Sequence, residues 1–474
     1  MGKSFIKDFS WYFIGSFIPI IIGVIKTPIF TRHFNQSDFG YLGLVLVTFS
    51  FIGMILFSWI GSCVWRYYPK YKERNNLKTL YSNLLFLIVI SIIILAIITS
   101  TWYFIELGKH IKELIFLSFF YTILNQIYSN YIIVIRIEGK ARLYTVLQSV
   151  KAFLSFAAAL IFVFVFNENI SALISSLLVI EFFAVAFLTL YNPSYISIKF
   201  NLISYKSLRE LLIYGSAGLL LNLCFLVIAT SDRYIIAWFG SIDQVGVYDQ
   251  VYKLSQLSVM ALVTIFFNTI NPTLINQLEV NYKSSKYLIR NYLKAIILLG
   301  FPIVFYLSFF SKDLASILLG IEFREGYPIM PFVFFAAYLH GISNFYELRL
   351  KFTNKFKKLS VIMIITTVLN LVLTIVFVKF YGYFFAAITT TFTYVILIFL
   401  FHIFDKEIII FSIKNTKFAC TLVILVSFQA ITFFLLDYLN ELTLVNKLLL
   451  ISLFVLMYIY VFKNRIKNIQ LFIN

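Results

Sequence analysis

Long apolar stretches dominate this sequence. Fourteen mainly apolar segments can be placed along its 474 residues, each of about 20 residues, the length of a helix that crosses a bilayer. They begin near Trp11, Leu42, Tyr81, Leu114, Leu143, Ile170, Leu211, Val245, Tyr292, Pro328, Leu359, Tyr383, Phe418 and Lys447. Only 13% of the residues are charged, whereas soluble domains carry about 25%. The sequence therefore predicts an all-α polytopic membrane protein with about 14 transmembrane helices.

The basic residues predict how the chain crosses the membrane. With the N-terminus inside, 27 Lys and Arg residues fall in the inner connections and tails, and 7 fall in the outer ones. Because Lys and Arg collect on the cytoplasmic side, this ratio favours an even number of spans with both termini in the cytoplasm. The same topology explains the formal charge of +18, so we expect no nucleic-acid partner. Abundant Phe, Ile, Lys, Asn and Tyr favour a bacterial source, and hence the bacterial cytoplasmic (inner) membrane.

Two outer turns of the predicted topology read alike. Phe34–Tyr41 lies between spans 1 and 2, and Phe239–Tyr248 lies between spans 7 and 8. Their glycines, Gly40 and Gly246, are 206 positions apart. Although outer turns often contain Gly and Asp, the matched positions favour an internal repeat, as in many transporters. We predict six-helix lobes at residues 1–210 and 211–410, and two additional transmembrane helices at residues 411–474.

Three segments carry a resemblance to a known family. Lys26–Tyr41, Ser231–Leu254 and Leu319–Pro328 resemble the first outer turn, the corresponding turn of the second lobe and the segment before span 10 of the polysaccharide flippases in the multidrug/oligosaccharidyl-lipid/polysaccharide exporter superfamily. The resemblance implies alternating access between two six-helix lobes. It also implies a cargo, an undecaprenyl-diphosphate-linked oligosaccharide that moves from the inner to the outer leaflet for O-antigen or capsule assembly. A polysaccharide polymerase and a chain-length regulator are then the expected protein partners, beside the membrane lipid.

Three charged residues fall in the outer half of the predicted membrane region. They are Lys26 on span 1, Asp232 on span 7 and Lys253 on span 8. A charge at the centre of a span costs roughly 2.5–3.5 kcal/mol on insertion scales, so each needs an explanation. Lys26 and Asp232 are also 206 positions apart, and we hypothesise that they meet at the repeat axis as part of an outer gate. The alternative is that each reaches the headgroups or pairs locally, Lys253 with Asp249 one turn away.

Lys151 on span 5 and Glu181 on span 6 form a second charged group. Counted from the inner ends of their antiparallel spans, both lie at similar depth, about 12–14 Å by helical rise. One interpretation is an ion pair that fixes the two spans. The other is functional: Lys151 holds the diphosphate, or Glu181 carries a coupling proton. Glu181 and Asp232 are the candidate coupling groups for an H⁺ or Na⁺ gradient, and we expect no other cofactor.

Further substrate-binding candidates lie near the predicted inner boundary and within several of the spans. Arg66 at the inner end of span 2 and Lys294 at the inner start of span 9 could line an inward vestibule, because Lys and Arg attract a diphosphate. Cytoplasmic anchoring explains both residues equally well. Other polar and aromatic residues of the spans could contact the sugars: Tyr248, Tyr252 and the Trp59/Trp65 pair by stacking on the rings, and Asn222, Asn268 and Asn271 by hydrogen-bonding the hydroxyls. Interface aromatics and contacts between helices are the alternatives.

Other functions remain open at this point. A peptidoglycan-precursor flippase, a teichoic-acid exporter and a drug or cation antiporter all belong to the same superfamily. A membrane glycan polymerase is the alternative from the enzymes, which usually need catalytic groups in a sizeable loop. The longest outer connection, Ser311–Tyr327, has 17 residues, and the sequence carries no paired Asp motif, phosphate loop or metal-ligand cluster. We therefore predict a transporter without catalytic or metal-binding residues.

Overall fold

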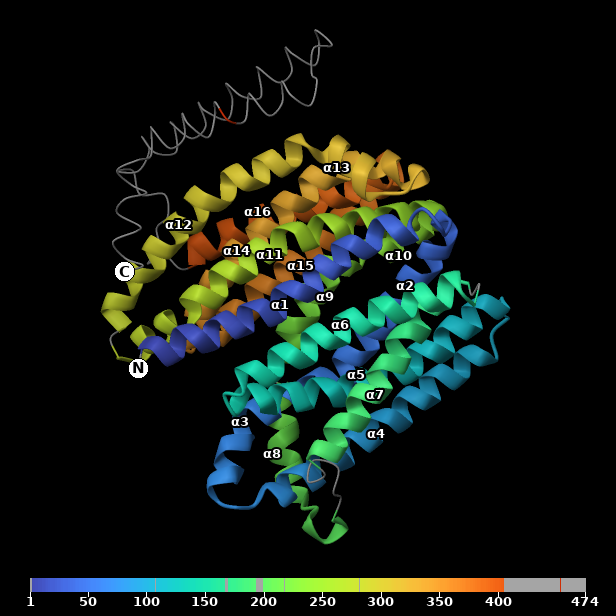
Figure 1. The fold of residues 1–474 in the computed structure, drawn as a ribbon. Coiled ribbons are helices and arrows are strands. Elements are labelled where there is room, and N and C mark those ends of the chain that lie inside the picture. The colour runs from blue at the N-terminus through green and yellow to red at the C-terminus, as the bar shows by residue number, and fades with distance from the viewer. Residues whose placement is uncertain are drawn as a thin grey trace.

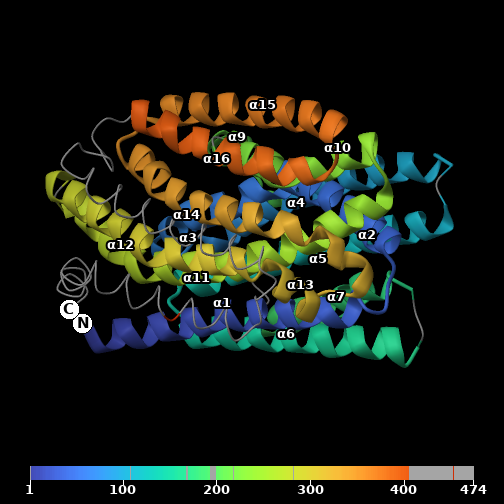
Figure 2. The same cartoon turned by 90° about the horizontal axis from the view of Figure 1, so that it is seen from above.

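The computed structural model describes residues 2–404, apart from residues 107, 167–168, 193–198, 217 and 281, together with residue 452. Every regular element in this part of the chain is helical (Figures 1 and 2). The first half contains α1 (Gly2–Phe30), α2 (Gln36–Gly53), the π-helical turn η1 (Met54–Ser58), α3 (Trp59–Glu73), α4 (Leu77–Tyr103), α5 (Lys109–Ile137), α6 (Ala141–Phe164) and α7 (Ala172–Tyr191).

A short 3₁₀ turn, η3 (Phe200–Leu202), precedes the second half of the described chain. That half contains α8 (Tyr205–Ser216), α9 (Leu219–Thr230), α10 (Asp232–Phe239), α11 (Ile242–Val280), α12 (Tyr282–Phe309), α13 (Ser311–Leu318), the 3₁₀ helix η4 (Ile321–Ile329), α14 (Met330–Phe352), α15 (Phe356–Tyr381) and α16 (Phe384–Phe404).

The helices confirm the predicted fold class. Ten helical stretches of the described chain are long and apolar enough to cross a membrane. The more polar α5 and α11, with 29 and 39 residues, correspond to the other two spans predicted before residue 405. The chain is therefore a multi-pass membrane protein. Predicted spans 13 and 14, and with them the unit at residues 411–474, lie outside the described residues except for residue 452.

One face of α15 shows how these helices are adapted to lipid. Val361, Ile364, Val368 and Val372 recur at helical spacing and are all more than 40% exposed. The opposite face is buried and polar, with Asn370 hydrogen-bonded to Thr393 of α16 at 3.0 Å. A helix that is apolar outside and polar inside suits a solvent of hydrocarbon, where internal polar groups must find partners within the protein.

The helices form two groups that meet along α11 (Figure 1). α1 packs on α6, α6 and α5 pack on α7, and α2 and α3 pack on α5. In the second group, α14 contacts α11, α12, α15 and α16. Contacts of α11 with α2 and α1 join the groups. Residue 210, the predicted boundary, lies within α8, which packs on α3 and α4 as well as on α9. The division at that residue stays a prediction.

The two groups approach each other closely at the glycines of the repeated turns. A Cβ atom on Gly40 would overlap the carbonyl oxygen of Ile242, and one on Gly246 would overlap the carbonyl oxygen of Gln36. Gln36 and Ile242 begin α2 and α11 and are themselves 206 positions apart. The crossing of α2 and α11 is therefore reciprocal, as expected for two halves related by an internal repeat.

Candidate functional site

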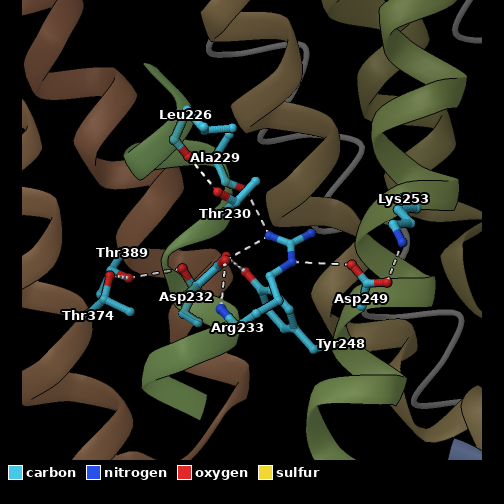
Figure 3. Close-up of polar contacts among 11 residues, drawn as sticks. Leu226, Ala229, Thr230, Asp232, Arg233, Tyr248, Asp249, Lys253, Thr374 and Thr389 are labelled. Atoms are coloured by element: carbon cyan, nitrogen blue, oxygen red, sulfur yellow. Dashed lines mark hydrogen bonds and ion pairs between the residues drawn. The ribbon is translucent and has the colours of Figure 1, made fainter. Parts of the chain in front are cut away.

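A cluster of buried charges lies where α10 and α11 meet (Figure 3). Asp232, Arg233 and Asp249 are each no more than 3% exposed. Arg233 Nη1 lies 2.7 Å from Asp232 Oδ1, and its Nε lies 3.3 Å from Asp249 Oδ1. Lys253 Nζ lies 2.6 Å from Asp249 Oδ2. Two cations thus face two carboxylates, which reduces the cost of removing these charges from water. We call Asp232, Arg233, Asp249 and Lys253 the charged cluster.

The local sequence positions each member of the charged cluster. α9 ends at Thr230 and α10 begins at Asp232, where a carboxylate is favoured by the helix dipole. This break lets Arg233 Nη1 donate a 2.7 Å hydrogen bond to the carbonyl of Ala229. On α11, Asp249 and Lys253 are four residues apart and share one face.

Two tyrosines of α11 enclose the Arg233 guanidinium. The hydroxyl of Tyr248 donates a hydrogen bond to Asp232 Oδ2. The guanidinium carbon of Arg233 lies 4.2 Å from the ring centroid of Tyr252 and 5.3 Å from that of Tyr248. At these distances both rings attract the cation. Arg233 is thus fixed by two carboxylates, one carbonyl and two aromatic faces.

Asp249 has room because its repeat equivalent lacks a side chain. Gly43 of α2 lies 206 positions before Asp249, and a Cβ atom there would be 3.2 Å from Asp249 Oδ2. The carboxylate therefore points across the interface between the two helix groups. Arg233 and Asp249 were not among the predicted site residues, although the adjacent Asp232-Arg233 pair was visible in the sequence.

The hypothesis that Lys26 meets Asp232 is corrected by the structure. Asp232 binds Arg233 and Tyr248, and among the described residues no ion pair joins it to Lys26. The Asp232 carboxylate pairs with Arg233, its neighbour in the sequence, and not with a cation of the opposite lobe. Lys26 Nζ lies 5.9 Å from the ring centroid of Phe30, and its helix α1 packs on α11, which carries Lys253. The local Lys253–Asp249 pair considered as the alternative is present.

The predicted Lys151–Glu181 ion pair is present between α6 and α7. Lys151 Nζ lies 2.5 Å from Glu181 Oε2, and Glu181 is fully buried. The ammonium also lies 3.8 Å from the ring centroid of Tyr128 on α5. The pair therefore links α5, α6 and α7 of the first group. The charged cluster lies on other helices, α10 and α11.

The two vestibule candidates lie in different helix groups. Arg66 of α3 is exposed, and its guanidinium carbon lies 5.9 Å from the ring centroid of Tyr214 on α8. Lys294 of α12 is partly buried. Neither residue belongs to the charged cluster.

Polar contacts join the two helix groups at the end that the charge pattern assigns to the outside. Arg32 Nη2 donates to the carbonyl of Ile317 at 2.9 Å. Gln36 Nε2 donates to the carbonyl of Glu322 at 2.6 Å. The backbone N–H of Gly320 donates to Thr31 Oγ1 at 2.8 Å. We call these three hydrogen bonds the outer turn contact. They hold the α1–α2 turn against the α13–η4 turn.

Comparison with known proteins gives consistent results. Residues 29–328 match the family described as polysaccharide biosynthesis protein. In sequence, the chain is similar to the uncharacterized membrane protein MJ1068 of Methanocaldococcus jannaschii, with 21% identity over 423 residues, 83% of this chain and 82% of the relative.

Solved structures share the fold. The lipid II flippase MurJ, in an inward closed conformation, matches with a TM-score of 0.74 and 14% identity, covering 96% of this chain and 99% of that one. An inward-facing multidrug resistance MATE family transporter of the MOP superfamily matches with a TM-score of 0.63 and 12% identity, covering 83% of this chain and 97% of that one.

Proposed function

This chain belongs to the polysaccharide biosynthesis protein family, and on that premise we propose that it is a lipid-linked glycan flippase. Its cargo is an undecaprenyl-diphosphate-linked oligosaccharide repeat unit. The protein moves this unit from the inner to the outer leaflet of the bacterial cytoplasmic membrane, with both termini in the cytoplasm. The product serves assembly of O-antigen or capsule, so a polymerase and a chain-length regulator are its expected partners.

The observation that carries this proposal is the pair of cations at the junction of α1 and α11. α1 packs on α11, where Gly23 faces Leu257, and Lys26 and Lys253 each lie about one helical turn from that contact. Lys253 is 42% exposed and shares Asp249 with Arg233, and no carboxylate among the described residues forms an ion pair with Lys26. An anionic group between the two ammonium groups would relieve their repulsion. A diphosphate has the required charge, whereas a cationic drug would add to the repulsion.

Alternating access provides the transport step in this proposal. The outer turn contact closes the outer end, and the substrate enters from the inside. Release then requires the three hydrogen bonds of that contact to open, with an H⁺ or Na⁺ gradient supplying the free energy. Glu181 and Asp232 are the proposed coupling groups. Arg66, Lys151 and Lys294 stay as proposed secondary contacts for the anionic cargo.

The first experiment is deletion of the gene followed by mass spectrometry of polyprenyl-linked lipids. We expect a completed diphosphate-linked repeat unit to accumulate while surface polysaccharide is lost. Accumulation of a peptidoglycan precursor would instead assign that cargo. Unchanged lipids with normal surface glycan would contradict the proposal and favour a drug or cation antiporter.

Complementation of the deletion tests the two lysines. We expect Lys26→Ala and Lys253→Ala each to lower the surface polysaccharide at equal protein level, because each removes one of the charges that attract the diphosphate. Lys109→Ala is the matched control, since Lys109 is an exposed lysine at the start of α5. If Lys26→Ala and Lys253→Ala both restore the surface polysaccharide fully, the diphosphate does not bind at this site.

A further inference from the structure

A pocket of about 280 Å³ opens beside the charged cluster. Its wall comes mainly from the second helix group, with Asn222 of α9, Gln256 of α11, His340 of α14 and Tyr394 of α16. Met54 of η1 adds a surface from the first group. Small-ligand pockets occupy roughly 300–1,000 Å³, so this one is slightly smaller than that range. It therefore suits a small compact group.

The pocket wall combines a continuous aromatic surface with free amides. The rings of Phe225 and His340 have centroids 5.3 Å apart, and those of His340 and Tyr394 are 5.5 Å apart. The side chains of Asn222 and Gln256 have no hydrogen-bond partner among the described residues. An amide both donates and accepts hydrogen bonds. A purely apolar ligand would leave these groups unsatisfied, at a cost in binding free energy.

The absence of charged side chains from the described lining argues against an ionised ligand. No Asp, Glu, Lys or Arg lies among the described residues that line the pocket, so an ionised group placed inside would have no counter-charge. Aromatic faces with a few hydrogen-bonding side chains are the features that orient a ligand in such pockets. A sugar ring has an apolar C–H face for the aromatic surface and hydroxyls for the amides.

The position of the pocket relates it to the cationic pair. Tyr252 lines the pocket and also lies under the Arg233 guanidinium. Gln256 follows Lys253 by three residues on α11, so both side chains project from neighbouring positions of one helix face. A ligand with a ring in the pocket therefore lies beside the face of α11 that carries Lys253.

We propose that this pocket binds the sugar that is attached directly to the diphosphate of the cargo, as an uncharged monosaccharide ring. The assignment rests on the proposed function and deepens it. The two lysines recognise the diphosphate, which every lipid-linked glycan carries, and the pocket recognises the first sugar. Specificity for the glycan is then set by Asn222, Gln256 and His340, and affinity for the anchor is set by the cations.

Binding of synthetic probes to the purified full-length protein tests the assignment. The probes are undecaprenyl diphosphate and the same lipid carrying one glucose, galactose or N-acetylglucosamine. For at least one sugar we expect binding about tenfold tighter than for the bare lipid, roughly the effect of one or two net hydrogen bonds. Asn222→Leu and Gln256→Leu should reduce that ratio to nearly one and leave binding of the bare lipid unchanged. Gln126→Leu, which removes an amide of α5 outside the pocket, should keep the ratio.

The outcomes separate the two proposals. If the wild-type protein binds no sugar-bearing probe more tightly than the bare lipid, or if the pocket variants weaken all probes equally, the pocket assignment is overturned. Lys26→Ala and Lys253→Ala should weaken every probe and leave the ratio unchanged. If the two lysine variants weaken the binding of no probe, the proposed diphosphate site is wrong. The pocket would still be a sugar site if Gln256→Leu removes the preference for the sugar-bearing lipid over the bare lipid.

Discussion

Gly40 and Gly246 pack reciprocally, each against the carbonyl oxygen of the residue four positions before the other. The relationship places the axis of the internal repeat at the crossing of α2 and α11. Both contacts are with backbone atoms, so a side chain on either glycine would overlap the main chain of the other helix. Any side chain at either position would push the helix groups apart.

Alanine at these glycines should therefore weaken the crossing. We expect Gly40→Ala and Gly246→Ala each to lower the free energy of unfolding by about 1–3 kcal/mol, the usual effect of overpacking. Thermal unfolding in detergent measures this loss. Gly108→Ala is the control, because nothing lies within 4 Å of its added Cβ atom. Equal thermal stability of Gly246→Ala and Gly108→Ala would contradict the close crossing.

Arg233 should be the most sensitive member of the charged cluster. Its removal leaves Asp232 without a cation in a buried site, and breaking such a pair typically costs about 3–5 kcal/mol. We expect Arg233→Ala to give little folded protein, measured by size-exclusion chromatography in detergent. Arg233→Lys should rescue poorly, because an ammonium cannot reach two carboxylates and stack on two rings as a planar guanidinium does. Near-normal folding of Arg233→Ala would show that the cluster is dispensable.

In the Lys151–Glu181 pair, the stabilising role of the ion pair can be tested separately from the proposed role of Glu181 in proton coupling. Glu181→Gln leaves a buried lysine without its counter-ion, so we expect a loss of about 3–5 kcal/mol in stability. The double variant Lys151→Met, Glu181→Gln removes both charges and should recover most of it. Transport by the double variant is then measured with and without a proton gradient. A response to the gradient equal to that of the wild type would exclude Glu181 as the coupling group.

A pH effect is expected from Glu138, which follows α5. Burial acts to raise the pKa of its carboxyl, but hydrogen bonds from Lys140, Tyr68 and Lys72 outweigh it and lower the pKa from 4.5 to about 2. Ionised Glu138 therefore stabilises the fold above about pH 4.5, and this contribution is lost as the pH falls towards about 2. The unfolding temperatures of the wild type and Glu138→Gln should thus converge at acidic pH. A constant difference between them would show that Glu138 does not titrate in this range.

Apolar length and charge were sufficient to predict the spans of the described chain. They were not sufficient for α10, α13 and η4, because elements of 8 or 9 residues are too short to leave a span-length signal. They also did not predict how far the helix of span 2 continues into the inner connection. α3 continues to Glu73, since charged residues such as Arg66 and Lys72 can extend a helix beyond the membrane.

Contacts of the candidate site were predictable only where the two residues are close on one helix or lie at the same membrane depth on neighbouring spans. Lys253–Asp249 follows from helical spacing, and Lys151–Glu181 follows from equal depth on antiparallel neighbours. The Arg233 contacts depend on the break between α9 and α10, which turns a residue assigned to the outer surface into a buried one. The free amides of Asn222 and Gln256 depend on four helices that meet only in the folded protein.

In the outer turn contact, the α13–η4 turn contributes only main-chain groups: the carbonyls of Ile317 and Glu322 and the N–H of Gly320. Apart from the glycine, these positions can change side chain during evolution while the closure is kept. Paired substitutions are therefore not expected between the two turns. Homologues can share this closure with otherwise unrelated α13–η4 sequences, and selection at the contact acts on the side chains of Thr31, Arg32 and Gln36 and on Gly320, where a Cβ atom would overlap the Thr31 carbonyl oxygen.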